Sequence, residues 1–599
     1  MLFGIAIAAV LQVGPGGDPS AIALVADPEP STAVAEETAP SDTSEDVAPT
    51  TTAPEPFAYR IGVLAGVTTE NFWAFYGDQP SVWNSYILGP TKVALYSLAP
   101  GTGILEPELA TETVTPSFDS EGWRVRVPLR EDLSWSDGSP ITADDVVFTF
   151  ETVRSLGLGG SWSEAFPTVI ESVHADSDYE LRIEFSERPT LGIWPHGPGL
   201  APVMSSGFWS GKLSGLDAAA LYELSGADDP ASGPLNLQSV EDNLLISNAN
   251  PGYGLTSTPD IVEYHVFSSE EEAVTALEQD QIDYVLSPKG LTAAHAERLG
   301  ADTAMEVTNS PANGVRYLGF NLNRAPMSDQ AFRAALALLV DRNDIANEIP
   351  TGATVANSFV SSANVKWFSP DGASANEVLF SGDVASRLSR ALIGLRAAGY
   401  TWEVEPQISA DGVISAGSGL LIDGVAPAPL TILTPGDEYD PSRPIHAATI
   451  AEALGLLGFD ARPVETDFDT VVDLAFTADE DGLLHYDMYL LGWTLGNPTW
   501  PGYYRPLFST TGAVNNTGYS SQAFEQALAA YESASTVEDA SVALWAMESV
   551  LAADLPYLLL YTSEITEAFR SDRVSFGHAD GLGGIQARLG GVLDVSPAD

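Results

Sequence analysis

The chain has no cysteine among its 599 residues. Disulfide frameworks, cysteine nucleophiles and cysteine-ligated zinc sites are therefore excluded. An exported protein that avoids thiol oxidation fits this composition, although the absence of cysteine does not by itself demonstrate export.

Basic residues are scarce. Only 25 Lys and Arg stand against 82 Asp and Glu, which gives a formal net charge of -57. Such a surface repels nucleic acid and anionic membranes, so neither is expected as a partner. The charge favours a salty medium, in which screening makes dense carboxylates tolerable, with a general acidic bias of the proteome as the alternative.

Motifs of catalysis and metal binding are also missing. The sequence holds no HExxH, GxSxG, Walker or GxGxxG pattern. No two of its seven histidines have the spacing of metal ligands on one helix. Asp479–Gly482 resembles a calcium loop but lacks the closing Glu. We therefore expect no enzymatic activity, no cofactor and no metal site.

Long apolar runs are limited to Met1–Val13, which is too short to span a bilayer comfortably. Residues 1–24 are similar to the apolar part of a signal peptide, with Ala21–Ala23 as a cleavage site, although no basic residues precede it. Either the true start lies upstream or the segment is an unusual anchor. Residues 25–57 are rich in Pro, Thr and acids, which predicts a disordered linker. We expect an extracytoplasmic protein, in the periplasm or at the cell surface.

What the sequence does contain is a distinctive stretch from Trp123 to Glu151. Apolar residues alternate with polar ones from Trp123 to Pro128, which predicts a strand. Ser136–Pro140 has the composition of a turn. Thr142 followed three residues later by Asp145 has the form of a capping box, which predicts a helix from that point.

This stretch resembles the signature of the family 5 solute-binding proteins, the extracellular receptors of peptide-type ABC importers. Residues that match the family pattern are Leu129, Arg130, Trp135, Ser136, Asp137, Gly138, Thr142, Ala143, Asp144, Asp145 and Val146. Further resemblances lie in residues 96–110, 231–254, 271–285 and 317–342. The zero cysteine count departs from the many Gram-positive members that carry a lipid anchor on a cysteine.

The resemblance implies an α/β fold, namely a two-lobed type II periplasmic-binding-protein fold with an additional third domain (cluster C type). Lobe I is expected to combine residues 58–98, 232–320 and 562–599. The additional domain is expected at 99–231, and lobe II at 321–561. Within lobe II the sequence predicts strands at 429–434, 459–464 and 486–494, and helices at 329–340, 446–457, 522–533 and 537–553. Ser328 is a candidate N-cap for the first of these helices.

The family further implies a receptor, expected to be a monomer. It would capture peptides or related solutes in an interlobe cleft and deliver them to a permease and ATPase complex. Two alternatives stay open. One is a surface or sensory binding protein that keeps the fold without transport, and the other is a hydrolase that uses paired carboxylates.

Aromatic residues gather in a Gly/Pro-rich loop at Leu490–Tyr504, which suits ligand contact as well as packing between lobes. The resemblance implies ligand-binding roles there for Trp493, Thr494, Leu495, Asn497 and Trp500. Peptide-binding members place an Asp in this loop for the ligand ammonium, but no acid stands at these positions. A free dipeptide held in the usual way is therefore not expected, because an unpaired buried ammonium is costly.

Other ligand-binding residues are predicted only from their places in the matched motifs. Val67 and Thr68 follow the first strand, where the family pairs its backbone with the ligand. Trp162 lies where members contribute an aromatic side chain. Arg443 ends a loop that supplies a carboxylate-binding Arg in dipeptide binders, and Asn516 precedes Tyr519 in a family-like motif.

Overall fold

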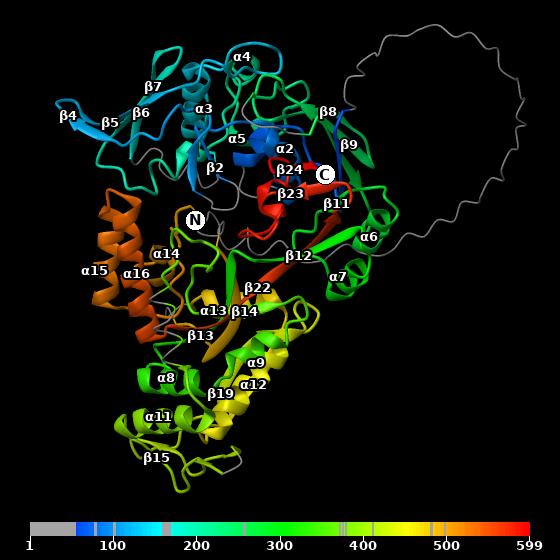
Figure 1. Cartoon of the computed structure of the whole chain (residues 1–599). Helices are drawn as coiled ribbons and strands as arrows, with labels where there is room; N and C mark the ends of the chain where they lie inside the picture. The colour runs from blue at the N-terminus through cyan, green and yellow to red at the C-terminus, as the bar shows by residue number, and fades with distance from the viewer. Residues whose placement is uncertain are drawn as a thin grey trace, which may run out of the picture.

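The protein is described here from a computed structural model. It covers residues 56–76, 81–99, 104–158, 169–254, 259–370, 373, 377, 380–409, 412–479, 483–495 and 499–598. The predicted signal-like segment and nearly all of the predicted linker lie outside these residues. The names lobe I, additional domain and lobe II are kept for the three regions (Figure 1). One predicted boundary is wrong: residues 314–320 were expected in lobe I, but they form β13 (Gly314–Phe320), which pairs with β21 (Met488–Thr494) and belongs to lobe II.

One large mixed sheet runs through both lobes in the order β20-β19-β21-β13-β22-β11-β1-β10-β9-β8. Its lobe I strands are β1 (Ala58–Val63), β8 (Leu235–Val240), β9 (Leu244–Ala249), β10 (Ile261–Val266) and β11 (Tyr284–Val285). Its lobe II strands are β13 (Gly314–Phe320), β19 (Leu430–Pro435), β20 (Ala461–Thr466) and β21 (Met488–Thr494). The long strand β22 (Tyr557–Arg570) belongs to both halves, since it pairs with β13 and with β11.

The strands of the two halves run in directions that bring their carboxyl ends toward each other. In lobe I, β11 runs antiparallel to β22, and β1 runs parallel to β11 and β10. In lobe II, β13 runs antiparallel to both β22 and β21, and β21 is parallel to β19. The carboxyl ends of β1, β10, β19 and β21 therefore all point to the place where β22 passes from one lobe to the other. We call this place the junction.

A second chain segment crosses the junction beside β22. Strand β12 (Met305–Pro311) pairs with the lobe I part of β22, and β13 follows it within lobe II. The lobes are thus joined by two adjacent strands, with the rest of each lobe on either side (Figure 1). Such narrow connections are typical of hinges.

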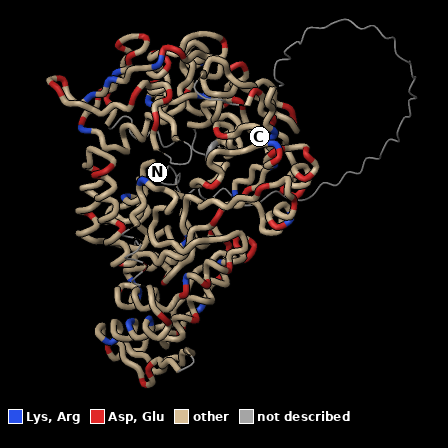
Figure 2. Tube along the Cα trace, viewed as in Figure 1, with Lys and Arg blue, Asp and Glu red and all other residues tan. Residues whose placement is uncertain are grey.

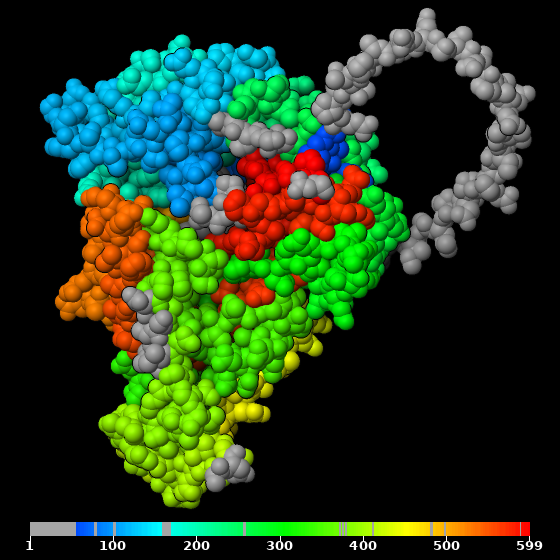
Figure 3. Space-filling view, viewed as in Figure 1, coloured from blue at the N-terminus to red at the C-terminus, as the bar shows by residue number. Residues whose placement is uncertain are grey.

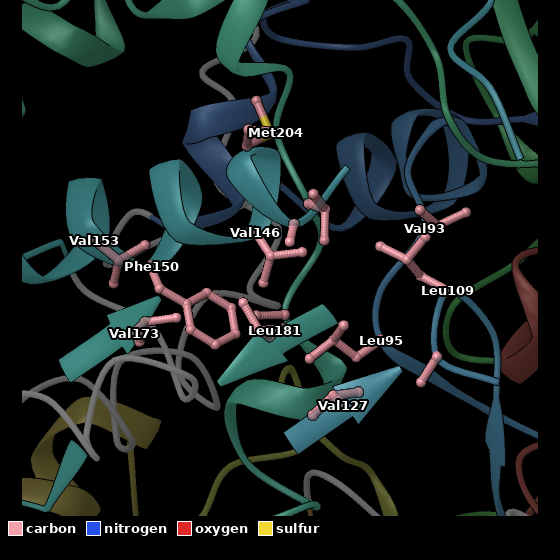
Figure 4. Packing of buried hydrophobic residues seen from close by; sticks show 14 of the residues in the cluster. Val93, Leu95, Leu109, Val127, Val146, Phe150, Val153, Val173, Leu181 and Met204 are labelled. Carbon is pink, nitrogen blue, oxygen red and sulfur yellow. The ribbon is translucent and has the colours of Figure 1, made fainter. Parts of the chain in front are cut away.

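The additional domain has a four-stranded sheet, β4-β5-β7-β6, and its own core. Its strands are β4 (Ser117–Asp119), β5 (Gly122–Pro128), β6 (Ile170–Ser177) and β7 (Glu180–Phe185). Helix α3 (Ala143–Leu156) covers the sheet, with Val146 and Phe150 packed toward Leu181 and Val173 (Figure 4). These contacts follow from the predicted strand and helix patterns, which are confirmed here.

The turn before α3 is tied together by one buried carboxylate. Asp145 accepts the Thr142 N–H at 3.0 Å, the Ser206 N–H at 2.8 Å and the Trp135 indole N–H at 3.3 Å. The predicted capping box is confirmed. Ser136 exchanges hydrogen bonds with the backbone of Ala231, so two separate sequence motifs meet in space. These hydrogen bonds therefore hold the additional domain to Ala231, where the chain passes from this domain back to lobe I.

Lobe II packs helices on both faces of its sheet. One core lies under α8 (Gln330–Leu339), α11 (Val384–Ala397) and α12 (Ser442–Leu456). The other lies under α13 (Phe468–Phe476), α14 (Tyr504–Phe508), α15 (Gln522–Ser533) and α16 (Val537–Asp554). The pairs β15-β18 and β16-β17 lie between residues 400 and 422, toward the lower tip in Figure 1.

Several predicted boundaries shift in the structure. Asp329, rather than Ser328, caps α8, because its carboxylate accepts the Ala331 N–H at 2.9 Å. Helix α12 begins at Ser442 rather than His446, whereas Gly458 has the expected positive φ just beyond its end. No helix within the described residues is long and apolar enough to cross a bilayer. Acidic residues are distributed over all three regions (Figure 2).

Candidate functional site

On the lobe I side of the junction, the loop after β1 is held by Asn84 of α2 (Val82–Leu88). The Thr68 N–H donates to Asn84 Oδ1 at 2.8 Å, and Asn84 Nδ2 donates to Thr68 Oγ1 at 3.0 Å. Val67 is half-buried and packs against the cores of both lobe I and the additional domain. The exposed Thr68 therefore stands at a fixed position beyond the carboxyl end of β1.

On the lobe II side, β21 ends in the predicted aromatic loop. Thr494 is exposed and pairs with Gly314, the first residue of β13. Leu495 is buried and exchanges hydrogen bonds with Asn313, at 2.9 Å through the Leu495 N–H and at 2.6 Å through its carbonyl. The start of the loop is thus clamped to the segment that crosses between the lobes.

Trp493 is half-buried and faces the lobe II core. Its ring stacks on Tyr317 with centroids 6.2 Å apart and packs edge-to-face with Phe476, with centroids 5.8 Å apart. Packing therefore covers much of the surface of the Trp493 side chain, and a ligand could contact only the part that stays exposed.

Trp500 bridges lobe II and the additional domain. Its indole stacks on Tyr531 at 4.5 Å and on His196 of the additional domain at 5.8 Å. A Cβ atom on Gly192 would approach Trp500 Nε1 to 2.3 Å, so only glycine fits beneath the indole. Trp367 packs against the indole in an edge-to-face arrangement, with ring centroids 5.4 Å apart. Trp500 thus joins the aromatic loop of lobe II to the additional domain.

Two guanidinium groups lie against the same strand, β21, at the carboxyl edge of the lobe II sheet. Arg443, at the start of α12, donates to Asp440 at 3.0 Å and to the Leu490 carbonyl at 3.4 Å. Arg316 of β13 lies across Gly492, where an added Cβ would stand 2.4 Å from Nη1. Asp440 is therefore the one carboxylate that forms an ion pair with either group within the described residues.

The electrostatics of this pair favour an anion. Desolvation lowers the pKa of Arg316, and the positive charge of Arg443 lowers it further. No hydrogen bond or ion pair of the Arg316 guanidinium exists within the described part of the chain. The first turn of α12 adds the partial positive charge of a helix amino end. A carboxylate placed here would relieve the repulsion between the two cations.

The structure brings Val67, Thr68, Trp493, Thr494, Leu495, Trp500 and Arg443 to loops or strand ends around the junction. Asn516 is not among them. Its side chain is buried, receives hydrogen bonds from Tyr489 and Tyr557, and donates to the Ala475 carbonyl at 3.0 Å. Those tyrosines lie toward the amino ends of β21 and β22, away from the junction. Trp162 and Asn497 lie outside the described residues.

Arg316 and Asn84 were not predicted from the sequence. A single cation within the apolar strand GVRYLGF was the available signal for Arg316. Asn84 gave no signal, because its role depends on the packing of α2 beside the loop after β1. Within the described residues, no cluster of three or more His, Asp or Glu side chains could hold a metal ion.

Comparison with known families identifies this architecture. Residues 105–515 match the model of the bacterial extracellular solute-binding proteins, family 5. The chain belongs to this family, whose members bind solutes and are not enzymes. The predicted family and fold class are therefore confirmed.

Curated relatives include peptide-binding proteins. The chain is 23% identical over 514 residues to the peptide transport periplasmic protein SapA of Salmonella typhimurium, which covers 80% of this chain and 82% of SapA. It is 22% identical over 278 residues to the oligopeptide-binding protein OppA of Lactococcus lactis, which covers 41% of this chain and 45% of OppA. Apart from SapA, the matches to curated relatives span about half of the relative's length or less.

Solved structures share the fold. The unliganded open form of the periplasmic murein tripeptide-binding protein MppA superposes with a TM-score of 0.69 at 17% identity, covering 90% of this chain and 98% of MppA. The periplasmic EDTA-binding protein EppA gives 0.66 at 18%, covering 90% and 96%. NikZ from Campylobacter jejuni in complex with Ni(L-His) gives 0.59 at 17%, covering 90% and 99%. The three names show that solutes of different chemistry occur on this fold.

Proposed function

We propose that the protein is the extracytoplasmic receptor of an ABC import system. It captures a peptide or a related small solute at the junction, closes its two lobes over it, and delivers it to a membrane permease and ATPase complex. The chain itself carries out no chemical reaction on the solute.

The convergence of strand carboxyl ends from both lobes carries this proposal. In α/β sheets, ligands bind beyond the carboxyl ends of strands, where loops and helix amino ends present polar groups. Here two such edges face each other across a connection of two strands. A solute that touches both edges stabilises the closed arrangement, because its contacts to the second lobe form only on closure.

Arg316 and Arg443 support a solute with a carboxylate. The loop that follows β21 supplies no acid for an ammonium group, whereas Arg316 of β13 and Arg443 of α12 supply two cations, of which only Arg443 has an ion pair in the described structure, with Asp440. We therefore propose that the carboxyl end of the solute binds at these guanidinium groups. Its amino end would be blocked, distant or held through neutral oxygens.

Four versions of one tripeptide test this arrangement: free, N-acetylated, C-amidated, and both acetylated and amidated. Isothermal titration calorimetry should show that acetylation changes affinity by less than about threefold. Amidation should weaken binding by about tenfold or more, the size of a lost charge-assisted hydrogen bond. The opposite order, with acetylation more damaging than amidation, would contradict the proposed orientation.

A further inference from the structure

A cavity of about 700 Å³ lies between the additional domain and lobe II. Its additional-domain wall includes Trp123, Leu191 and Trp194, and its lobe II wall includes Trp367 and Val537. In Figure 3 the additional domain (blue to cyan) rests on α15 and α16 (orange) on this side of the molecule. The volume is within the range of small-molecule sites.

The cavity differs from the junction in position and lining. Its lobe II side is built from residues 364, 366, 367, 499 and 534–538. Thr499 belongs to the loop after β21, whereas the other residues follow none of the strands β1, β10, β19 and β21. Trp500 lies beside it, stacked between His196 and Tyr531. A molecule in the cavity would touch the additional domain and lobe II without touching the strand ends of lobe I.

The walls are suited to a planar apolar group. Three tryptophans contribute to the lining from two different domains, and aromatic faces stack favourably on other rings. Apolar walls give water few hydrogen-bond partners, so an apolar solute would replace that water at little cost.

Two polar groups give the cavity chemical selectivity. His196 is 92% buried, lines the cavity, and its Nδ1 atom has no hydrogen-bond partner within the described residues. Arg188 lies at the exposed rim, donates to Ser535, and has its guanidinium carbon 5.9 Å from the centre of the Trp123 ring. No carboxylate in the described structure pairs with Arg188, whereas the neighbouring Lys366 is neutralised by Glu538 at 2.7 Å.

We propose that this cavity is a second ligand site, which takes a small planar apolar solute with one anionic group. The ring would lie among Trp123, Trp194 and Trp367, with the anion at Arg188 and a polar edge toward His196. Since such a solute would touch both the additional domain and lobe II, it would stabilise their contact through Trp500. This site is separate from the solute site proposed at the junction.

Three probes with one ring and different charges test the proposal: indole-3-acetate, indole and tryptamine. Calorimetry on the full chain should rank affinity in that order. Arg188→Gln should weaken indole-3-acetate by about fivefold, which corresponds to about 1 kcal/mol for an exposed charge, and leave indole within about twofold. Arg462→Gln removes an equally exposed Arg from β20 and should change neither value.

Blocking variants locate the site. Ser535→Trp and Thr115→Trp fill the cavity from opposite walls at exposed positions, so both variants should fold. Each should weaken indole-3-acetate by about tenfold or more and leave binding of a junction peptide unchanged. Absence of binding of all three probes at millimolar concentration, a preference for tryptamine, or binding that survives both blocking variants would overturn the proposal.

Discussion

The turn at Ser136–Asp145 and the loop at Trp493–Trp500 carry two of the most distinctive sequences of the chain, and they differ in how their polar groups are used. In the turn, one buried carboxylate binds three donors of its own domain. Beside the start of the loop, Arg316 of β13 lies across Gly492 of β21, and its guanidinium has no partner in the described structure. The residues that match the family signature thus include a buried hydrogen-bond acceptor with a structural role, whereas the sequence departs from the family pattern in the region that we propose for binding.

Removing the carboxylate of the turn should have the largest effect. Asp145→Ala deletes three hydrogen bonds to a buried charged acceptor, so the free energy of unfolding should fall by about 4 kcal/mol. Urea unfolding followed by tryptophan fluorescence measures the change.

The matched control for the turn is Asp144→Ala, which removes the neighbouring exposed carboxylate and should cost less than about 1 kcal/mol. Equal stability of the two variants would contradict the assignment of Asp145 as the fastening group.

Lobe II also contains a buried carboxylate, and burial there disfavours its charged form. Glu548 of α16 accepts the Phe359 N–H and the Tyr504 hydroxyl, but burial raises its pKa to about 7. Between pH 4.5 and 7 the folded chain holds a proton that the unfolded chain has released. The free energy of unfolding therefore falls as pH rises through this window.

Glu548→Gln should remove the part of this pH dependence that Glu548 contributes. The variant and the wild type should match at pH 4, and the variant should be more stable by about 3 kcal/mol at pH 8, from a rise of about 2.5 in pKa. Thermal or urea unfolding at both pH values measures it, with the exposed Glu297→Gln as control. A constant difference between variant and wild type at both pH values would show that ionisation of Glu548 has no part.

The cation at the strand edge should affect binding rather than stability. Arg316→Gln should weaken a solute with a free carboxylate by about tenfold, or about 1.4 kcal/mol, because one of two guanidinium donors is lost. The melting temperature without solute should stay equal or rise, since desolvation and Arg443 already disfavour this charge. A lower melting temperature together with unchanged affinity would assign Arg316 a structural role instead.

The smallest effect is expected on the lobe I side of the junction. Thr68→Val removes the acceptor of the 3.0 Å hydrogen bond from Asn84 and should cost about 1 kcal/mol of unfolding free energy. Thr354→Val, at an exposed position on β14 (Ala353–Val355), serves as control. Amide hydrogen exchange in the loop after β1 should increase only in the Thr68 variant.

Local patterns in the sequence predicted much of the fold. The alternation at Trp123–Pro128 and the capping box at Thr142 became β5 and α3, and α15 spans the predicted residues 522–533. Strand β22 was predicted only as far as Tyr561, because its continuation to Arg570 mixes apolar and polar residues in a strand that serves two lobes. The periodicity of the sequence therefore did not predict that β22 continues from lobe II into lobe I.

The candidate site was predictable only in part. Loops after β1 and β21 follow from strand order, so Thr68 and Trp500 could be placed beyond strand ends. Arg316 depends on the pairing of β13 with β21, which brings residues 316 and 492 together. The burial of Asn516 depends on Tyr489 of β21, Tyr557 of β22 and Tyr486, which lies just before β21. Such contacts are set by tertiary pairing, which single-sequence patterns do not report.

The central claim, capture of a solute at the junction, is tested most directly by native mass spectrometry of the full chain purified from its own host. The account predicts one small molecule with a carboxylate bound per chain, released on denaturation and lost from the Arg316→Gln, Arg443→Gln double variant. If the wild-type chain has only the mass of the unbound protein, and its melting temperature does not shift with any peptide or sugar tested, capture of a solute at the junction is contradicted.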